Sequence, residues 1–380
     1  MALIERSGGI GGFVEFVQHK KSLVTSARSA LLLSYIIGIF IFIESSITAL
    51  IAGAVGKPLC EKYKVPRAKL AFVCDSTSAP ISSLIVLNGW GALLLGLIST
   101  EIDKGMLQGD ALNILIDAVL YNFYSMSALA VTFLVIYFNV NIGAMKYAKY
   151  EPSCFDIDTK DAKNMYYMII PIVLMVFFVF VFLYITGDGN VLKGSGSSSI
   201  FYTMLATLLF TLVYYVGTNN MSLLTWAKTS YSGAKKLSGI AFVLLLAFAI
   251  GSVTSELKTG LYLASLANDN LSIYLLAGVV FVLSAMISFS TGTSWGTFSI
   301  MIPVAIPMAV GMDANVALCI GAVISGGVFG DHCSPISDTT IISSLAAECD
   351  VIEHVRTQLP YALISGIIAL GFFLVFSFLA

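Results

Sequence analysis

The stretch FGDHCSPISDTTIISS, residues 329–344, lies between two apolar runs near the end of the chain. It contains two aspartates (Asp331 and Asp338), a histidine, a cysteine, a proline and six hydroxyl residues. Ionisable side chains at membrane depth cost roughly 3 kcal/mol each, so a lipid-facing helix would not carry this set. Gly330 and Pro335 favour a helix that breaks at that depth, where its freed backbone groups line a cavity inside the protein.

The composition of the whole chain shows which environment surrounds this stretch. Of 380 residues, 58% are hydrophobic and 11% are charged, and the mean hydropathy is +0.91. A soluble domain carries about 25% charged residues. Runs of roughly 20 apolar residues recur, which is the length that a membrane-spanning helix requires. The sequence therefore predicts an all-α polytopic membrane protein and excludes a soluble protein of two or three domains.

The charge and the cysteines exclude other classes of protein. The net charge of −2 gives no indication of nucleic-acid binding. The six cysteines contain no CxxC pair, and most lie in or beside apolar segments. We therefore expect packed thiols without a disulfide framework. No cofactor is expected.

The apolar segments and the basic loops predict a topology. Apolar segments lie at 29–56, 70–99, 112–144, 165–186, 199–217, 239–254, 271–289, 295–311, 314–346 and 357–379. Lysine and arginine concentrate in cytoplasmic loops. Placing the basic loop 57–69 inside also puts the basic segments 146–163 and 228–236 inside. Segment 14–28 is the exception, because it would lie outside with three basic residues.

A second stretch, DSTSAPISS at residues 75–83, resembles the first one. Both contain Pro-Ile-Ser, beginning at Pro80 and Pro335, with an aspartate four or five residues upstream. An offset of 255 residues aligns them and also brings Glu44 near the polar break at 290–294. The alternative explanation is chance similarity of apolar sequence rich in serine and proline.

Repeats of this kind predict the architecture. Inverted repeats with discontinuous helices that meet at the midplane are the layout of many secondary transporters. We predict one inverted repeat at 1–144, a cytoplasmic linker at 145–164 and a second inverted repeat at 165–380. The second copy has three additional spans at its start. We therefore expect that the first copy lacks its first helices, and an inactive fragment is one functional alternative.

Three strings carry a resemblance to a known family. FSTGTSWGTFSIMIPVAIPMA (289–309), GGVFGDHCSPISDTTIISS (326–344) and KPLCEKYKVPRAKLAFVCDSTSAP (57–80) resemble the NhaC-type Na+/H+ antiporter family. The resemblance covers most of the chain and implies a secondary transporter of the cytoplasmic membrane that exchanges Na+ for H+. Some relatives couple Na+ or H+ to carboxylate or amino-acid movement. From this resemblance we expect two departures from the family: the first spans are missing, and Glu44-Ser45-Ser46 stands where many members carry paired aspartates.

The residue types in these stretches suit a Na+ site. Na+ binds several oxygen ligands, and a broken helix frees carbonyls at the end where its dipole favours a cation. We expect Asp331 and Asp338 as the main ion carriers, with Asp75 contributing. Further oxygen ligands are expected from Ser334, Ser337, Thr339, Ser76, Thr77, Ser82, Glu44, Thr293 and Ser294. The helix breaks are expected at Gly330, Pro335, Pro80 and Gly292.

Exchange requires that one site hold either cation but not both. Burial favours the neutral form of a carboxylate, so a proton and Na+ compete for it. Each residue also has a structural interpretation. An aspartate can cap a half-helix, and hydroxyl groups can bond the freed backbone. His332 is either a proton relay or a structural group that stabilises the break.

Two other functions stay open at this point. On the same fold, a small organic acid or amino acid could exchange with Na+ or H+, because half-helix N-termini near Pro80 and Pro335 could bind a carboxylate. No arginine lies near either motif. A metal enzyme using Asp331, His332 and Cys333 is disfavoured, because three adjacent residues cannot easily face one ion. We expect Na+, H+ and the lipid bilayer as partners, without nucleic acid, and a homodimer stays open as the assembly.

Overall fold

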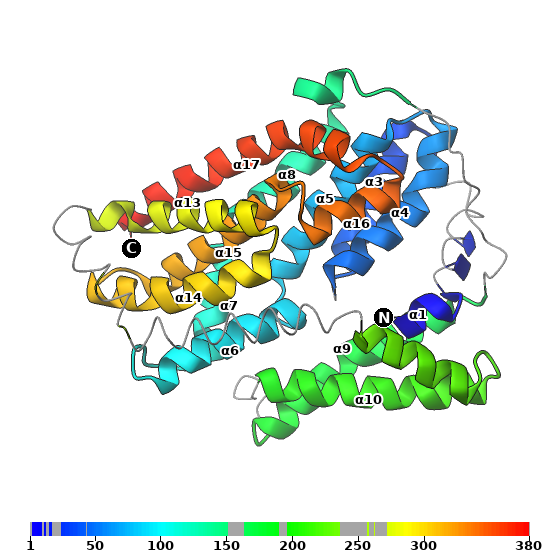
Figure 1. Cartoon of the computed structure of the whole chain (residues 1–380), viewed down its shortest axis with the longest axis horizontal. Coiled ribbons are helices and arrows are strands. Elements are labelled where there is room, and N and C mark those ends of the chain that lie inside the picture. The colour runs from blue at the N-terminus through cyan, green and yellow to red at the C-terminus, as the bar shows by residue number, and fades with distance from the viewer. Residues whose placement is uncertain are drawn as a thin grey trace. The chain divides into compact units, whose positions relative to one another are not determined.

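The protein is helical throughout the part of the chain that the structure describes (Figure 1). The computed structural model describes residues 2–9, 11–12, 15–16, 24–42, 44–150, 163–189, 196–235, 257, 262 and 272–379. Five of the described helices are long and apolar enough to cross a membrane, or up to seven if each bent helix pair is one span. The predicted span at 239–254 lies outside the described residues.

The chain forms two compact units. One comprises Met1–Thr25 and Ser153–Val243, and the other comprises Ser26–Pro152 and Leu244–Ala380. The first unit contains α1 (Ala2–Arg6), α9 (Tyr166–Thr186) and α10 (Gly196–Gly217). In it, α9 packs along α10, and the Tyr215 hydroxyl donates to the carbonyl of Tyr167 at 2.7 Å. The two units are defined by which residues pack together, and they do not test the predicted repeats. The repeat boundaries at 144 and 165 therefore stay a prediction.

The second unit contains the helices that carry both polar stretches. They are α3 (Ala27–Phe40), α4 (Ser45–Lys62), α5 (Arg67–Leu84), α6 (Gly89–Asp103), α7 (Ala111–Leu120), α8 (Phe123–Tyr137), α13 (Ile273–Thr291), α14 (Ser294–Gly311), α15 (Val316–Cys333), α16 (Asp338–Ala347) and α17 (Val351–Leu379). A short 3-10 turn, η1 (Gly143–Lys146), follows α8. Figure 1 shows α16 beside α4 and α5, so the two stretches meet inside this unit.

Two of the predicted apolar segments are bent pairs of helices. The bend is 42° between α5 and α6 and 41° between α7 and α8. The predicted apolar segment at 112–144 therefore contains two helices joined by a bend. Asn122 caps α8 by accepting a bond from the Ser125 amide, and its own amide group reaches Ser83 in α5. A capping asparagine in an apolar run starts a new helix because it satisfies free amides at the bend.

The helix breaks fall at three of the places where polar residues interrupt apolar sequence. Gly292 ends α13 with φ of +66°, a conformation that favours glycine, and Thr293 caps α14. Pro335 lies between α15 and α16, and Glu44 lies between α3 and α4. The break expected at Pro80 is wrong, because α5 continues to Leu84. A proline removes one helical hydrogen bond, and the rest of the helix here is held by packing on every side.

Gly330 lies within α15 and has a packing role instead of marking the break. A Cβ atom there would clash with the carbonyl oxygen of Ala285 in α13, and one at Gly326 would clash with that of Phe281. Small residues allow membrane helices to approach closely, which increases van der Waals contact. These two glycines therefore permit the close contact of α13 with α15.

The helices of the second unit pack in two matched sets. α3 packs on α4 and α5 as α13 packs on α14 and α15, and α6 packs on α14 as α16 packs on α4. The starts of α4, α5 and α6 are separated from those of α14, α15 and α16 by one constant interval. This interval is shorter than the 255 residues that align the Pro-Ile-Ser elements. Matched packing with a constant interval supports a structural repeat.

We predict that Gly326→Ala destabilises the protein by about 1–3 kcal/mol, because the added methyl group overpacks the α13–α15 contact. The measurement is the thermal unfolding midpoint of the purified protein in detergent. Gly96→Ala in α6 is the control, since nothing lies within 4 Å of a Cβ atom there. Alanine is also the better helix former, so the control keeps or slightly raises the midpoint. Equal midpoints for the two variants would contradict the close contact.

Candidate functional site

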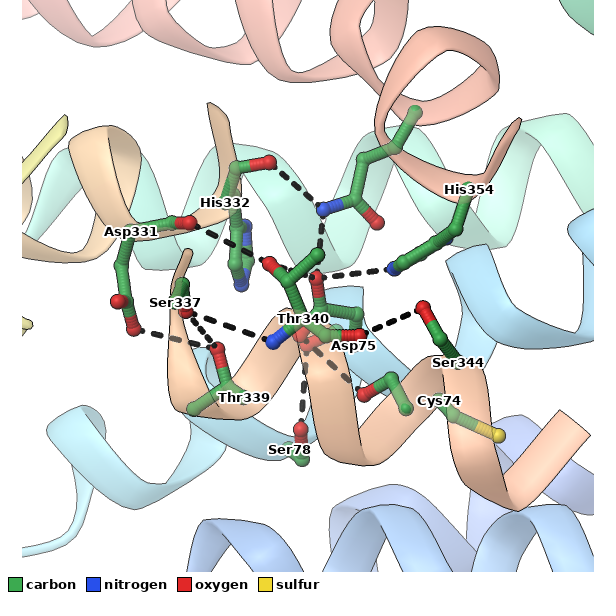
Figure 2. Close-up of polar contacts among 12 residues, drawn as sticks. Cys74, Asp75, Ser78, Asp331, His332, Ser337, Thr339, Thr340, Ser344 and His354 are labelled. Carbon is green, nitrogen blue, oxygen red and sulfur yellow. Dashed lines mark hydrogen bonds and ion pairs between the residues drawn. The ribbon is translucent and has the colours of Figure 1, made fainter. Parts of the chain in front are cut away.

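Asp75 lies at the centre of a buried polar cluster formed by α5, α16 and α17 (Figure 2). From α16, the hydroxyls of Thr340 and Ser343 donate to its carboxylate at 3.4 and 3.3 Å. From α17, the side-chain amide of Gln358 donates at 2.6 Å, and Nε2 of His354 lies at 3.3 Å. Four polar side chains from two helices thus surround one carboxylate, which offsets the loss of hydration on burial.

Gln358 joins this carboxylate to the end of α15. Its amide nitrogen donates to Asp75 and also, at 2.9 Å, to the backbone carbonyl of His332. His332 lies in the last turn of α15, directly before the break. One planar amide group therefore connects the carboxylate on α5 to the broken helix.

Asp331 lies in the same last turn and is 1% exposed. Its Oδ2 accepts a hydrogen bond from the Thr339 hydroxyl at 3.2 Å. Its Oδ1 is buried and has no hydrogen-bond partner among the residues that the structure describes. The hydroxyl of Ser337 lies 3.1 Å from that of Thr339. Asp331 is therefore a buried carboxylate with one oxygen left for a further ligand.

Four helix ends meet around Asp331. The Ser334 hydroxyl donates to the Phe289 carbonyl near the end of α13 at 2.9 Å. Ser294, the first residue of α14, donates to the Gly327 carbonyl at 3.3 Å. The C-terminal ends of α13 and α15 favour a cation, and the N-terminal ends of α14 and α16 favour an anion. A carboxylate with a bound cation matches both kinds of helix end, because the carboxylate is favoured by the N-terminal ends and the cation by the C-terminal ends.

Figure 2 shows Thr340 between the two aspartates. Its hydroxyl lies 3.4 Å from the Asp75 carboxylate and 3.4 Å from the Asp331 carbonyl. A hydroxyl has one proton to donate, so it can fully satisfy only one of these acceptors. The hydroxyl of Thr340 thus couples the two parts of the cluster.

His332 and a tyrosine extend the cluster to α8. Nδ1 of His332 lies 3.0 Å from the hydroxyl of Tyr124, and both residues are buried. Nε2 of His332 has no partner among the described residues. This geometry is compatible with both predicted roles of His332, as a proton relay and as a structural group.

Other predicted site residues lie outside this cluster. Asp338 is an exposed side chain at the start of α16, where it accepts a bond from the Thr339 amide at 2.9 Å. Glu44 accepts from the Ser46 amide and is an electrostatic neighbour of Asp338. Asp338 is also an electrostatic neighbour of Asp331 and Asp75, but it makes no described hydrogen bond to either of them.

The remaining hydroxyl residues have mainly local contacts. Thr77 donates to the carbonyls of Val73 and Cys74 in its own helix. Thr293 caps α14, and Ser76 is buried within α5. The hydroxyl of Ser82 is buried without a partner among the described residues. None of these four makes a described hydrogen bond to either aspartate.

The sequence interpretation missed His354, Gln358, Thr340, Ser343 and Tyr124. The apolar run predicts a final span that begins at 357, which does not include His354. In the structure α17 begins at Val351, so His354 and Gln358 lie one turn apart on the same face. The spacing of four between a histidine and a glutamine, just before an apolar run, was the available signal.

The two aspartates are not equivalent positions of the repeat. At the interval that relates the helix starts, Asp331 corresponds to Ser82 and Asp75 corresponds to Ile324. The alignment of the two Pro-Ile-Ser elements, by contrast, brings the two aspartates within one residue of each other. The cluster is instead one asymmetric site with two unlike carboxylates.

The chain matches the family model described as the Na+/H+ antiporter family over residues 88–378. It belongs to this family. A protein of Haemophilus influenzae, described as uncharacterized, is 33% identical to it over 381 residues, which covers 95% of this chain and 73% of the relative. Membership makes the chain a multi-pass membrane antiporter, of Na+ and H+ or of related substrates.

Shorter similarities and one solved structure extend this result. A Malate-2H(+)/Na(+)-lactate antiporter of Bacillus subtilis is 36% identical over 28% of this chain and 23% of the relative. An uncharacterized Na(+)/H(+) antiporter of Haemophilus influenzae is 44% identical over 22% of this chain and 19% of the relative. The Alcanivorax borkumensis YdaH transporter aligns with a TM-score of 0.51 and 15% identity, covering 98% of this chain and 82% of that one. This last likeness shows the fold alone.

We predict that Gln358→Met lowers stability by about 1–3 kcal/mol, because it leaves the buried Asp75 without its shortest donor. The measurement is the unfolding midpoint in detergent. In an Asp75→Asn background the same substitution has a smaller effect, since the charge is gone. Ser365→Ala is the control on the same helix, because the one hydrogen bond of its hydroxyl among the described residues goes to the nearby Tyr361 carbonyl. Strict additivity of the two substitutions would show that the Asp75–Gln358 bond contributes nothing.

Proposed function

We propose that this antiporter exchanges Na+ for H+ across the cytoplasmic membrane and that the two cations compete for Asp331. The observation that carries the proposal is the buried Oδ1 of this carboxylate, which has no hydrogen-bond partner among the described residues. An unpaired carboxylate oxygen in a protein interior is unfavourable. Binding either a proton or a cation removes that penalty, so the group is suited to alternate between the two.

The surroundings of Asp331 suit Na+ as one of the two occupants. The hydroxyls of Thr339, Ser337 and Ser294 lie near the carboxylate or near the adjoining helix ends. Hydroxyl and carbonyl oxygens with one negative charge are ligands that a hard cation prefers. In the proton-bound state the carboxyl group is neutral, and the same site carries no net charge.

Asp75 has a different role in this proposal. Its carboxylate already has four polar partners, all of them side chains. Replacing them by a transported ion would require α16 and α17 to move together. We therefore assign Asp75 to holding these helices around the ion-binding carboxylate.

Transport of organic ions is the competing function, because one relative is described as a malate and lactate antiporter and another as an arginine/ornithine antiporter. The described cluster around Asp75 and Asp331 contains carboxylates, hydroxyls, an amide and histidines, without arginine or lysine. Organic acids are usually bound through a basic side chain. The cluster therefore favours a small cation over an organic acid.

We predict that Asp331→Asn reduces Na+-driven proton movement at least tenfold, because asparagine can neither release a proton nor neutralise a cation. The assay follows a pH indicator inside vesicles as Na+, Li+ or K+ is added in turn. Asp313→Asn is the control, because Asp313 is exposed in the turn before α15 and its φ of +55° also suits asparagine. Full exchange in Asp331→Asn would refute the assignment of the site.

Uptake of labelled malate or arginine by the wild type, without Na+-driven proton movement, would favour the competing function.

A further inference from the structure

Two basic side chains hold the C-terminal end of α16. Lys57 in α4 forms an ion pair with Glu348, the residue that caps α16. Arg67, the first residue of α5, donates to the backbone carbonyl of Glu348 at 3.0 Å and lies 3.7 Å from its carboxylate. The side chains of Lys57, Arg67 and Glu348, which we call the ionic clamp, are 7%, 20% and 27% exposed, so solvent reaches only a minor part of it.

Charge and shape both favour this contact. The C-terminal end of a helix carries partial negative charge, which attracts the two basic groups. Glu348 has φ of +52°, a conformation that is uncommon for residues other than glycine and is held here by its partners. Gly53 of α4 faces the end of α16, and a Cβ atom there would lie 2.8 Å from the Ala346 carbonyl oxygen. The last turn of α16 is therefore seated directly on α4.

The same short helix carries hydroxyls that contact both aspartates. Thr339 donates to Asp331, and Thr340 and Ser343 donate to Asp75. With 10 residues in α16 and about 1.5 Å of rise per residue, the clamp lies within roughly 15 Å of these hydroxyls along the helix axis. A helix this short moves as one piece, so a constraint at its end also constrains the hydroxyls at its start.

The clamp belongs to one copy of the structural repeat. The starts of α4 and α5 and those of α14 and α15 are separated by the same number of residues. At this separation, Lys57 corresponds to Ile306 and Arg67 corresponds to Val316. Apolar residues at these positions cannot form an equivalent clamp on α6. The ionic contact is therefore specific to α16, the half-helix that contacts the two aspartates.

We propose that Lys57 and Arg67 are positioning residues, which hold α16 through Glu348 and thereby set the affinity of the Asp331 site for its cation. The identity of that cation rests on the proposed Na+/H+ exchange, whereas the mechanical role of the clamp does not. Without the clamp the oxygen ligands are still present but are no longer held in place. The oxygen ligands must then be ordered when the cation binds, and the free energy of this ordering lowers the affinity of the site for the cation.

The kinetic test uses the whole chain in vesicles. Lys57→Met and Glu348→Gln should raise the half-saturating Na+ concentration three- to tenfold while the maximal rate stays within twofold. Lys57→Arg keeps the charge and should restore most of the affinity. Lys62→Met is the control, because Lys62 is exposed at the end of the same helix and lies over the ring of Tyr63. An unchanged half-saturating concentration, or a loss confined to the maximal rate, would overturn the proposed role.

A second readout does not depend on transport. Amide hydrogen exchange over residues 338–349, measured in detergent, should become at least tenfold faster in Lys57→Met and stay unchanged in Lys62→Met. Unchanged exchange in Lys57→Met would overturn the clamp even if the protein transports Na+. Faster exchange in a protein that moves no Na+ would support the clamp and refute the proposed substrate. The two proposals can therefore fail separately.

Discussion

Burial of the Asp75 carboxylate imposes the strongest constraint on the structure. A charged group inside an apolar protein is tolerated only if hydrogen-bond donors replace its water. The donors to Asp75 come from α16 and α17. These two helices must therefore pack against α5 for Asp75 to stay charged. The break between α15 and α16 follows, because a continuous helix could not bring Thr340 and Ser343 to that point.

The local part of the site could be predicted from sequence, and the distant part could not. Residues 329–344 identified Asp331, Ser337 and Thr339, which lie close together because one short break joins them. His354 and Gln358 reach the site only through the packing of α17 on α5, and no local pattern reveals that packing. Asp338 shows that a position within the motif does not by itself predict the contacts of a side chain. It lies in the same motif, but in the first turn of α16 its carboxylate accepts from the Thr339 amide and does not join the hydrogen bonds of Asp75 and Asp331.

The presence of a repeat could be predicted from the sequence, but the residues that correspond between its two copies could not. The shared Pro-Ile-Ser element suggested that Pro80 and Pro335 occupy matching breaks. The structure keeps Pro80 inside α5 and matches the helices at another interval. A proline is compatible with a helix when neighbouring helices supply the lost stabilisation. Short motifs in apolar sequence therefore reveal a duplication more reliably than they reveal its register.

The one-sided ionic contact between α16 and the α4–α5 corner also bears on how the helices of the transporter can move. The net direction of exchange is determined by the two ion gradients, and no internal contact can alter it. Separating two partners of an ion pair that is shielded from solvent is unfavourable, so a motion that lifts α16 from α4 has to overcome this contact. The corresponding positions of the other copy are apolar, so the matching separation of α6 from α14 breaks no equivalent ion pair.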